Sequence, residues 1–207
     1  MLGYRKDNYI YLRIPKNACT TYGMFLESKG WNQFELNPFE DYSNCLVWGH
    51  IADPETRYMK GLAEYLLTRY EEDEIEFLLT DPVASKMLIS GVFDQHTYTI
   101  SMLLGPFNKL PVHWIPLDFS MYSPKYGREL DGDGFTNLFF KDQGFNYNIT
   151  PIDRRKPGSH PNKVFRERIR ELKFKHKPYY GELVASALNY DIVLYHKIML
   201  EYVAKYS

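Results

Sequence analysis

The stretch "YLRIPKNACTTYGMFLES", residues 11–28, decides the fold that this sequence predicts. It begins within the run "YIYLRI" (9–14), whose aromatic and β-branched side chains favour a buried strand that ends at Pro15. The "TTYGMFLES" that follows has the apolar spacing of a helix, and Gly30 is a typical helix end. The stretch therefore predicts a strand, a loop at 15–19 and a helix in immediate succession.

The same strand–helix unit recurs further along the chain. "NCLVWGHI" (44–51) is typical of a second buried strand, and "DPETRYMKGLAEYLLTRY" (53–70) of its helix, with Asp53 as cap and Pro54 at the first helical position. "PVHWIPLDF" (111–119) resembles a third strand. This alternation predicts an α/β fold of three layers, in which a short parallel sheet is flanked by helices.

The rest of the sequence is mostly helical in pattern. Further helices are expected at 71–91, interrupted by Pro82, at 94–105 and, as two or three amphipathic helices, over 161–206. Between 131 and 161, turn formers such as "DGDG" and "KPGSHP" surround one short expected helix, "TNLFFKDQG".

Composition suits one compact domain covering residues 1–207. The chain is 44% hydrophobic and 16% aromatic, and it holds no run of the roughly 18 apolar residues that a membrane span needs. The start of the sequence lacks a signal-peptide pattern, so we expect a soluble, cytoplasmic protein in which Cys19 and Cys45 are thiols. The histidines and cysteines show no metal-ligand spacing, so no metal is expected.

Charge is strongly segregated along the chain. Net charge is −1, yet residues 154–177 carry ten Lys or Arg against two Glu, a local charge of +8. Such a segment attracts phosphate, sulfate or nucleic acid. The alternative is a solvated helix face, because Phe165, Ile169 and Leu172 give the same segment an ordinary core stripe.

The loop at 15–19 has the features of an anion-binding site. A loop between a buried strand and a helix start presents unbonded N–H groups and the positive end of the helix dipole. Lys16 adds a point charge, Thr20 and Thr21 add hydroxyl donors, and the small Ala18 allows close approach to the backbone. The G-x-x-x-x-G-K-[ST] pattern of a Walker A loop is absent. The alternative is a plain connection with an exposed Lys.

"IPKNACTT" (14–21) closely resembles the first signature of the sulfotransferases, particularly of their carbohydrate branch, and "ADPETRYMKG" (52–61) resembles the second. The resemblance implies a P-loop NTPase-like sulfotransferase fold. It also implies transfer of a sulfuryl group from PAPS, 3′-phosphoadenosine-5′-phosphosulfate, to a hydroxyl of a small molecule or carbohydrate. By resemblance, the residues that hold the 5′-phosphosulfate are Pro15, Lys16, Asn17, Ala18, Cys19, Thr20 and Thr21.

The second signature departs from the family pattern at two ligands of the 3′-phosphate. The family's first arginine falls on Ala52, and its serine falls on Lys60. Lys60 can supply the lost charge, because it is three residues from Arg57 on a helix and both side chains can share a face. The 3′-phosphate ligands expected here are Arg57, Lys60, Arg154 and Arg155. In the alternative interpretation, Arg57, Lys60 and Glu64 form a charged stripe on the solvent-exposed face of the helix and bind no phosphate.

Sulfuryl transfer needs charge stabilisation and a base for the acceptor. Lys16 is the expected charge stabiliser. His96 is the first candidate base, since Asp94 is near enough in sequence to orient it, and His50, at the carboxyl end of a strand, is the second. By resemblance to some sulfotransferases, Glu35 or Glu40 can serve instead.

Two other functions stay open on the sequence alone. One is a nucleotide-dependent phosphotransferase, for which Asp53 and Asp118 are the carboxylates available to hold Mg²⁺, and which metal dependence would reveal. The other is a non-catalytic protein that binds nucleotide weakly, or a polyanion through residues 154–177. No aromatic signature indicates nucleic-acid binding, and no segment indicates a membrane partner. The sequence does not indicate an oligomeric state.

Overall fold

The computed structural model describes residues 1–107, 109–150 and 163–207, the side chains of 163 and 164 excepted. The described residues form two compact units, here called the sheet unit and the helical unit. The sheet unit comprises those within Met1–Asp53, Leu104–Pro157 and Leu194–Ser207, and the helical unit those within Pro54–Leu103 and Gly158–Val193. The chain therefore passes between the two units several times.

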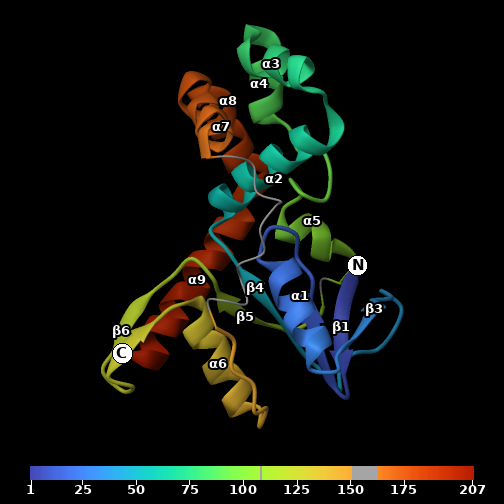
Figure 1. The fold of residues 1–207 in the computed structure, drawn as a ribbon, viewed down its shortest axis with the longest axis vertical. Helices are drawn as coiled ribbons and strands as arrows, with labels where there is room; N and C mark the ends of the chain where they lie inside the picture. The colour runs from blue at the N-terminus through green and yellow to red at the C-terminus, as the bar shows by residue number, and fades with distance from the viewer. Residues whose placement is uncertain (108, 151–162) are drawn as a thin grey trace. The chain divides into compact units, whose positions relative to one another are not determined.

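A five-stranded mixed sheet organises the sheet unit (Figure 1). Its order is β3-β1-β2-β4-β5, where the strands are β1 (Leu2–Lys6), β2 (Tyr9–Leu12), β3 (Asn32–Glu35), β4 (Leu46–Ile51) and β5 (Val112–Pro116). β1 pairs antiparallel with β2 and β3, whereas β2, β4 and β5 run parallel. The three predicted strands are confirmed as these parallel ones, so their carboxyl ends meet at one edge.

Helices flank this sheet, as the α/β prediction requires. α1 (Cys19–Ser28) follows β2, and α6 (Gly132–Asp142) follows a small hairpin of β6 (Met121–Ser123) and β7 (Arg128–Leu130). α6 packs Phe139 on Trp48 of β4, with ring centroids 4.8 Å apart. Residues 194–206 of α9 (Asn189–Tyr206) place Tyr202 against Phe135 of α6.

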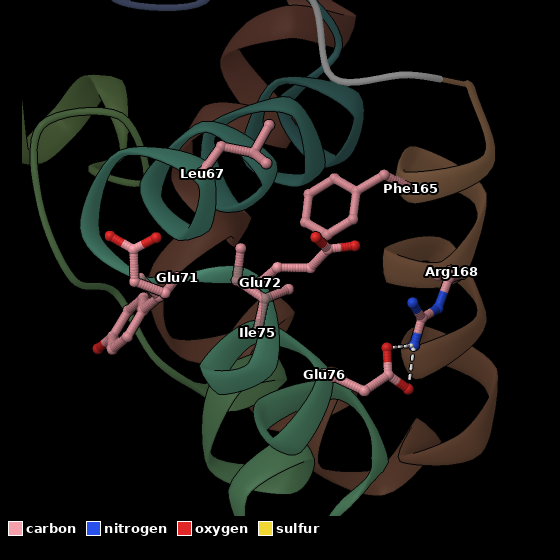
Figure 2. A pocket seen from close by; sticks show the side chains of 8 residues that line it. Leu67, Glu71, Glu72, Ile75, Glu76, Phe165 and Arg168 are labelled. Atoms are coloured by element: carbon pink, nitrogen blue, oxygen red, sulfur yellow. Dashed lines mark hydrogen bonds and ion pairs between the residues drawn. The ribbon is translucent and has the colours of Figure 1, made fainter.

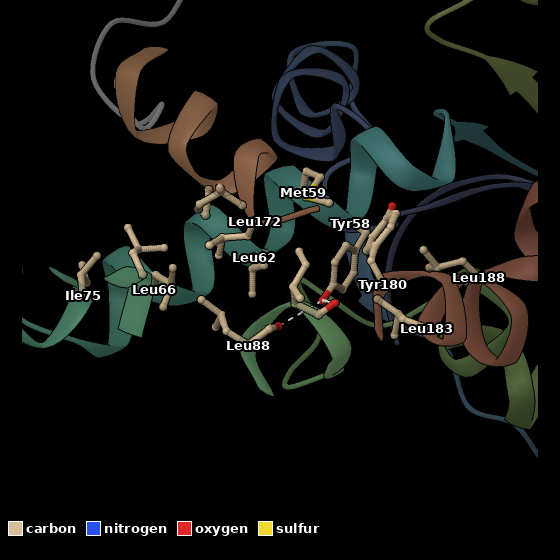
Figure 3. Close-up of a cluster of buried hydrophobic side chains, with 14 residues drawn as sticks. Tyr58, Met59, Leu62, Leu66, Ile75, Leu88, Leu172, Tyr180, Leu183 and Leu188 are labelled. Atoms are coloured by element: carbon tan, nitrogen blue, oxygen red, sulfur yellow. Dashed lines mark hydrogen bonds between the residues drawn. The ribbon is translucent and has the colours of Figure 1, made fainter. Parts of the chain in front are cut away.

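The helical unit has its own apolar core (Figure 3). Its helices are α2 (Pro54–Arg69), α3 (Glu72–Thr80), α4 (Pro82–Ser90), α5 (Ile100–Leu104, up to residue 103), α7 (Lys163–Lys175) and α8 (Lys177–Leu183), followed by a π-helical turn (Val184–Leu188) and the start of α9. Leu62 and Leu66 of α2 belong to one buried cluster with Ile169 and Leu172 of α7. The predicted break at Pro82 is confirmed, because Asp81 caps α4 there.

Two element predictions were wrong in their bounds. The helix expected at 94–105 covers only α5, since residues 94–97 form a turn in which the Thr97 hydroxyl accepts the Phe93 and Asp94 amides. α6 begins inside the "DGDG" expected to be a turn, because the Asp131 carboxylate accepts the Gly134 amide at 2.9 Å and caps the helix. No helix within the described ranges is both long and apolar enough to span a membrane.

Candidate functional site

The loop between β2 and α1 has an unusual backbone. Lys16 and Ala18, on either side of Asn17, have positive φ angles of 64° and 54°. Non-glycine residues rarely adopt this left-handed conformation, and each such residue costs about 1–3 kcal/mol that the surroundings must offset. Successive N–H groups in alternating conformations of this kind form concavities that bind anions. The surrounding structure of the sheet unit must therefore hold the loop in this backbone conformation.

Asn17 holds the loop against the sheet. Its side chain is only 1% exposed, and its Nδ2 donates to the backbone oxygen of His50 in β4 at 2.6 Å. The Asn17 N–H also donates to the Ile14 oxygen at 3.2 Å. The Oδ1 atom has no hydrogen-bond partner among the described residues. Asn17 therefore fixes the loop to the carboxyl edge of the parallel strands.

The N-terminus of α1 opens directly onto this loop. Its N-cap residue, Ala18, offers no side-chain acceptor, and the first turn contains no acidic residue. The first N–H groups of a helix have no acceptor within the helix, so they favour an anion. Thr20 is exposed, Thr21 is half-buried, and Cys19 is a free cysteine, as is Cys45.

A buried polar network lies behind the loop. His50 is fully buried and stacks on Tyr22 of α1, with ring centroids 3.7 Å apart. Its Nδ1 lies 3.2 Å from the Tyr11 hydroxyl, and its Nε2 lies 3.0 Å from the Thr136 hydroxyl of α6. The Tyr22 hydroxyl donates to Asp133 at 2.8 Å. The network thus joins the loop, β2, β4 and the first turn of α6.

Proton counting assigns the tautomer of His50. The Thr136 hydroxyl donates to the Gly132 oxygen at 2.6 Å, so it accepts from His50 and Nε2 carries the proton. Nδ1 then accepts from Tyr11, whose pKa burial raises well above its ordinary value. Both ring nitrogens of His50, the second candidate base, therefore make hydrogen bonds, and its side chain has no exposed surface. Its observed contacts are those of a residue that supports the loop.

Two carboxylates stand at the same carboxyl edge. Asp53 follows β4 and Asp118 follows β5, and the Asp53 N–H donates to Asp118 Oδ2 at 3.3 Å. Burial raises the pKa of Tyr195 to about 12, and the charges of Asp118 and Asp53 add to this rise. The two aspartates therefore lie near each other in the sheet unit. No group of three or more metal-binding side chains is found among the described residues.

Arg57 of the helical unit is a buried ion-pair partner. It has no exposed surface, its Nη2 lies 3.7 Å from Asp191 Oδ2, and it donates to the Tyr98 oxygen. Asp191 also accepts the Ile100 N–H at 2.5 Å, at the start of α5. Burial lowers the pKa of Arg57 and raises the pKa of Asp191. The charge of each partner acts in the opposite direction on the other's pKa but does not outweigh burial. The solvated-stripe alternative is therefore wrong for Arg57, and a nucleotide would reach its guanidinium only if this packing opened.

His96, also in the helical unit, is oriented by a carboxylate. Its Nδ1 lies 3.0 Å from Asp94 Oδ2, and its N–H donates to Asp94 Oδ1 at 2.9 Å. The side chain is 25% exposed, and the contact with Asp94 turns Nε2 away from the carboxylate. The turn is seated on α2, where a Cβ added to Gly61 would come within 1.9 Å of the His96 oxygen.

The remaining predicted residues are spread over the chain. Glu35, which lies 3.9 Å from the N-terminal amino group, ends the edge strand β3, and Glu40, 3.7 Å from Arg5, follows it. β1 separates β3 from β2, which leads into the loop. Lys60 is half-buried on α2. Arg154 and Arg155 lie outside the described residues.

Four residues of the buried network were not predicted: Tyr11, Tyr22, Asp133 and Thr136. Asp133 belongs to the "DGDG" that indicated a turn, and Tyr22 and Thr136 match ordinary helix positions. Their only sequence signal is a polar atom on an otherwise apolar face of a helix or strand. Comparison with known proteins adds nothing to their roles, because no protein-family model, curated protein or solved structure matches the chain.

Proposed function

We propose that the protein is a PAPS-dependent sulfotransferase that moves a sulfuryl group to an acceptor hydroxyl, on a carbohydrate or another small molecule, and that its fold is the P-loop-like fold of that family. The observation that carries this proposal is the left-handed loop at residues 15–18. It carries the first signature, is fixed by Asn17 to β4, and opens onto the start of α1. Such a site favours a phosphate or sulfate group.

The residues present fit one half of PAPS better than the other. The loop, the α1 N-terminus and Lys16 suit the 5′-phosphosulfate. For the 3′-phosphate, position 52 is a buried alanine and Arg57 is ion-paired inside the helical unit. Recognition of the 3′-phosphate therefore depends, in this proposal, on Lys60 and on Arg154 and Arg155.

The chemistry assigns separate tasks to the side chains. PAPS, when bound, supplies the sulfuryl group and a phosphate leaving group. Lys16 and the first N–H groups of α1 offset the negative charge that develops. His96 remains the proposed base, because Asp94 holds Nδ1 and leaves Nε2 to accept the proton of the acceptor hydroxyl.

Calorimetric titration tests the donor site. The ligands are 3′-phosphoadenosine-5′-phosphate and its analogue without the 3′-phosphate, and the proteins are the natural chain, Lys16→Ala and the exposed control Lys125→Ala. A charge-assisted contact contributes about 1.5–3 kcal/mol, so Lys16→Ala should weaken binding at least about tenfold, whereas Lys125→Ala should not. Binding that ignores both Lys16 and the 3′-phosphate would overturn the proposal.

A specific observation favours a second function, a Mg²⁺-dependent phosphotransferase. Asp53 and Asp118 lie together at the edge that holds the loop, and Mg²⁺ is commonly held by one or two carboxylates together with substrate phosphates. In that case ATP would bind only with Mg²⁺, and Asp118→Asn would weaken this Mg²⁺-dependent binding. Metal-independent binding of the 3′-phosphorylated nucleotide would exclude this alternative.

A further inference from the structure

A groove in the helical unit combines an apolar floor with negative charge. It has a volume of about 380 Å³ and lies between the end of α2, α3 and α7. Figure 2 shows Leu67, Ile75 and Phe165, which come from these three helices, around it. Leu67 is 47% exposed although it is apolar. The groove therefore combines an exposed apolar side chain, Leu67, with further apolar lining residues.

The described side chains that line the groove carry a net negative charge once their ion pair is counted. Arg168 lies 2.8 Å from Glu76 Oε2 and 2.9 Å from Oε1, so the cation of the groove is neutralised (Figure 2). Glu71 and Glu72 line the groove as well. The Glu72 side chain makes no hydrogen bond or ion pair with any described residue. Among the described lining residues, Glu71 and Glu72 thus have no matching cation.

A second hollow of about 330 Å³ extends this surface along α3. It shares Tyr70 with the groove and is lined by Asp73, Glu74, Phe77 and Leu78. Phe77 is 60% exposed. We call the two hollows together the acidic face. The acidic residues in the first turn of α3 stabilise the helix by interacting with its dipole. The dipole does not account for the exposed apolar side chains of Leu67 and Phe77. Exposed apolar side chains rimmed by charge mark interaction sites.

We propose that the acidic face docks a basic amphipathic helix of a partner protein. An apolar side chain of that helix enters the groove between Leu67, Ile75 and Phe165, and its lysines or arginines lie beside Glu71 and Glu72. A helix suits this surface because it presents apolar and basic side chains at adjacent positions one turn apart. Charge complementarity selects a basic partner and speeds its association. This inference is independent of the proposed donor site.

Fluorescence anisotropy with the whole protein tests the proposal. The probe is a labelled 14-residue helix of lysine and leucine with leucines on one face, and its scrambled version has the same composition. Leu67→Ser and Glu72→Lys should each weaken binding of the probe about tenfold. The controls Val83→Ser and Glu171→Lys change an exposed apolar and an exposed acidic residue of the same unit elsewhere, and they should change binding less than twofold. Thermal unfolding verifies that all variants fold.

Three results would overturn the proposal. Equal loss of binding in Glu171→Lys would mean that the peptide senses only general negative charge. Equal binding of the scrambled peptide would mean that no helical face is recognised. Full displacement of the probe by hexylamine at similar concentration would mean that the groove binds a small organic cation instead of a helix.

Discussion

The Asp94 carboxylate accepts hydrogen bonds from both the ring and the backbone of His96. Burial alone would raise the pKa of Asp94, but these hydrogen bonds hold it below its ordinary value of 3.8. The contact therefore favours the ionised carboxylate in the folded state. A carboxylate that stays ionised keeps the His96 ring in one orientation over a wide pH range.

We expect Asp94→Asn to lower the free energy of unfolding by about 1 kcal/mol near pH 6, because the charge-assisted contact is lost. Since the pKa of Asp94 is depressed on folding, its contribution is present above pH 3.8 and disappears as the pH falls through the folded-state value. Urea unfolding of both proteins from pH 6 down to pH 2.5 measures this difference. A difference that stays constant with pH would contradict the assignment.

Arg57 shows why single roles were hard to predict. Its place in the second signature indicates a phosphate ligand, and its helix position indicates a solvated charge. The structure instead pairs it with Asp191, which is more than a hundred residues away in the sequence and has no pattern linking it to Arg57. Lys16 and Ala18 are similar: the motif locates their loop, but the left-handed backbone depends on Asn17 and the neighbouring strand.

At the scale of elements, α2 is seated against the turn that carries His96. Gly61 has no room for a side chain, because a Cβ there would come within 1.9 Å of the His96 backbone oxygen. Helix propensity alone favours alanine over glycine by about 1 kcal/mol. Overpacking costs about 1–3 kcal/mol, and the contact is with backbone, so the steric effect dominates.

Gly61→Ala should therefore destabilise the protein by about 1–3 kcal/mol and shift the NMR signals of the His96 ring. Gly181→Ala in α8 is the matched control, since nothing lies within 4 Å of its added Cβ. The control should stabilise the protein by about 0.5–1 kcal/mol. Urea unfolding compares the two; equal effects would show that α2 does not contact the turn this closely.

The elements predicted best were those with long apolar patterns. β2, β4, α2 and the broken pair α3 and α4 follow from periodicity and from Pro82. β1 and β3 were missed because they are short and rich in polar residues; "NQFE" has one half-buried residue and gains its strand conformation from pairing with β1. α6 was predicted too short because a capping Asp131 and a turn-forming Asp look alike in sequence.

At the scale of the whole molecule, each unit draws on separated stretches of chain. The helical core places Leu62 and Leu66 of the first stretch with Ile169 and Leu172 of the second. A peptide of residues 54–103 would therefore lack five of the fourteen buried residues of this core. Isolated short helices are marginal in water, so we expect it to be largely unfolded.

Addition of a second peptide, residues 163–193, should restore helical structure if the two stretches complete one core. Circular dichroism of each peptide and of their equimolar mixture measures this. We expect the helical signal of the mixture to exceed the sum of the separate signals by at least about half. A first peptide already helical and cooperatively melting by itself would contradict the described core.

The hydrogen bond from Asn17 to the His50 oxygen has a thermodynamic consequence for any anion that binds the loop. Ordering one residue's backbone costs about 1–2 kcal/mol in conformational entropy, and here the left-handed turn is already ordered by the sheet. An incoming phosphate would meet amides that need no rearrangement, so its binding entropy should be dominated by released water. The loop would then act as a rigid receptor, which selects anions by how well they fit its fixed shape and does not adjust to them.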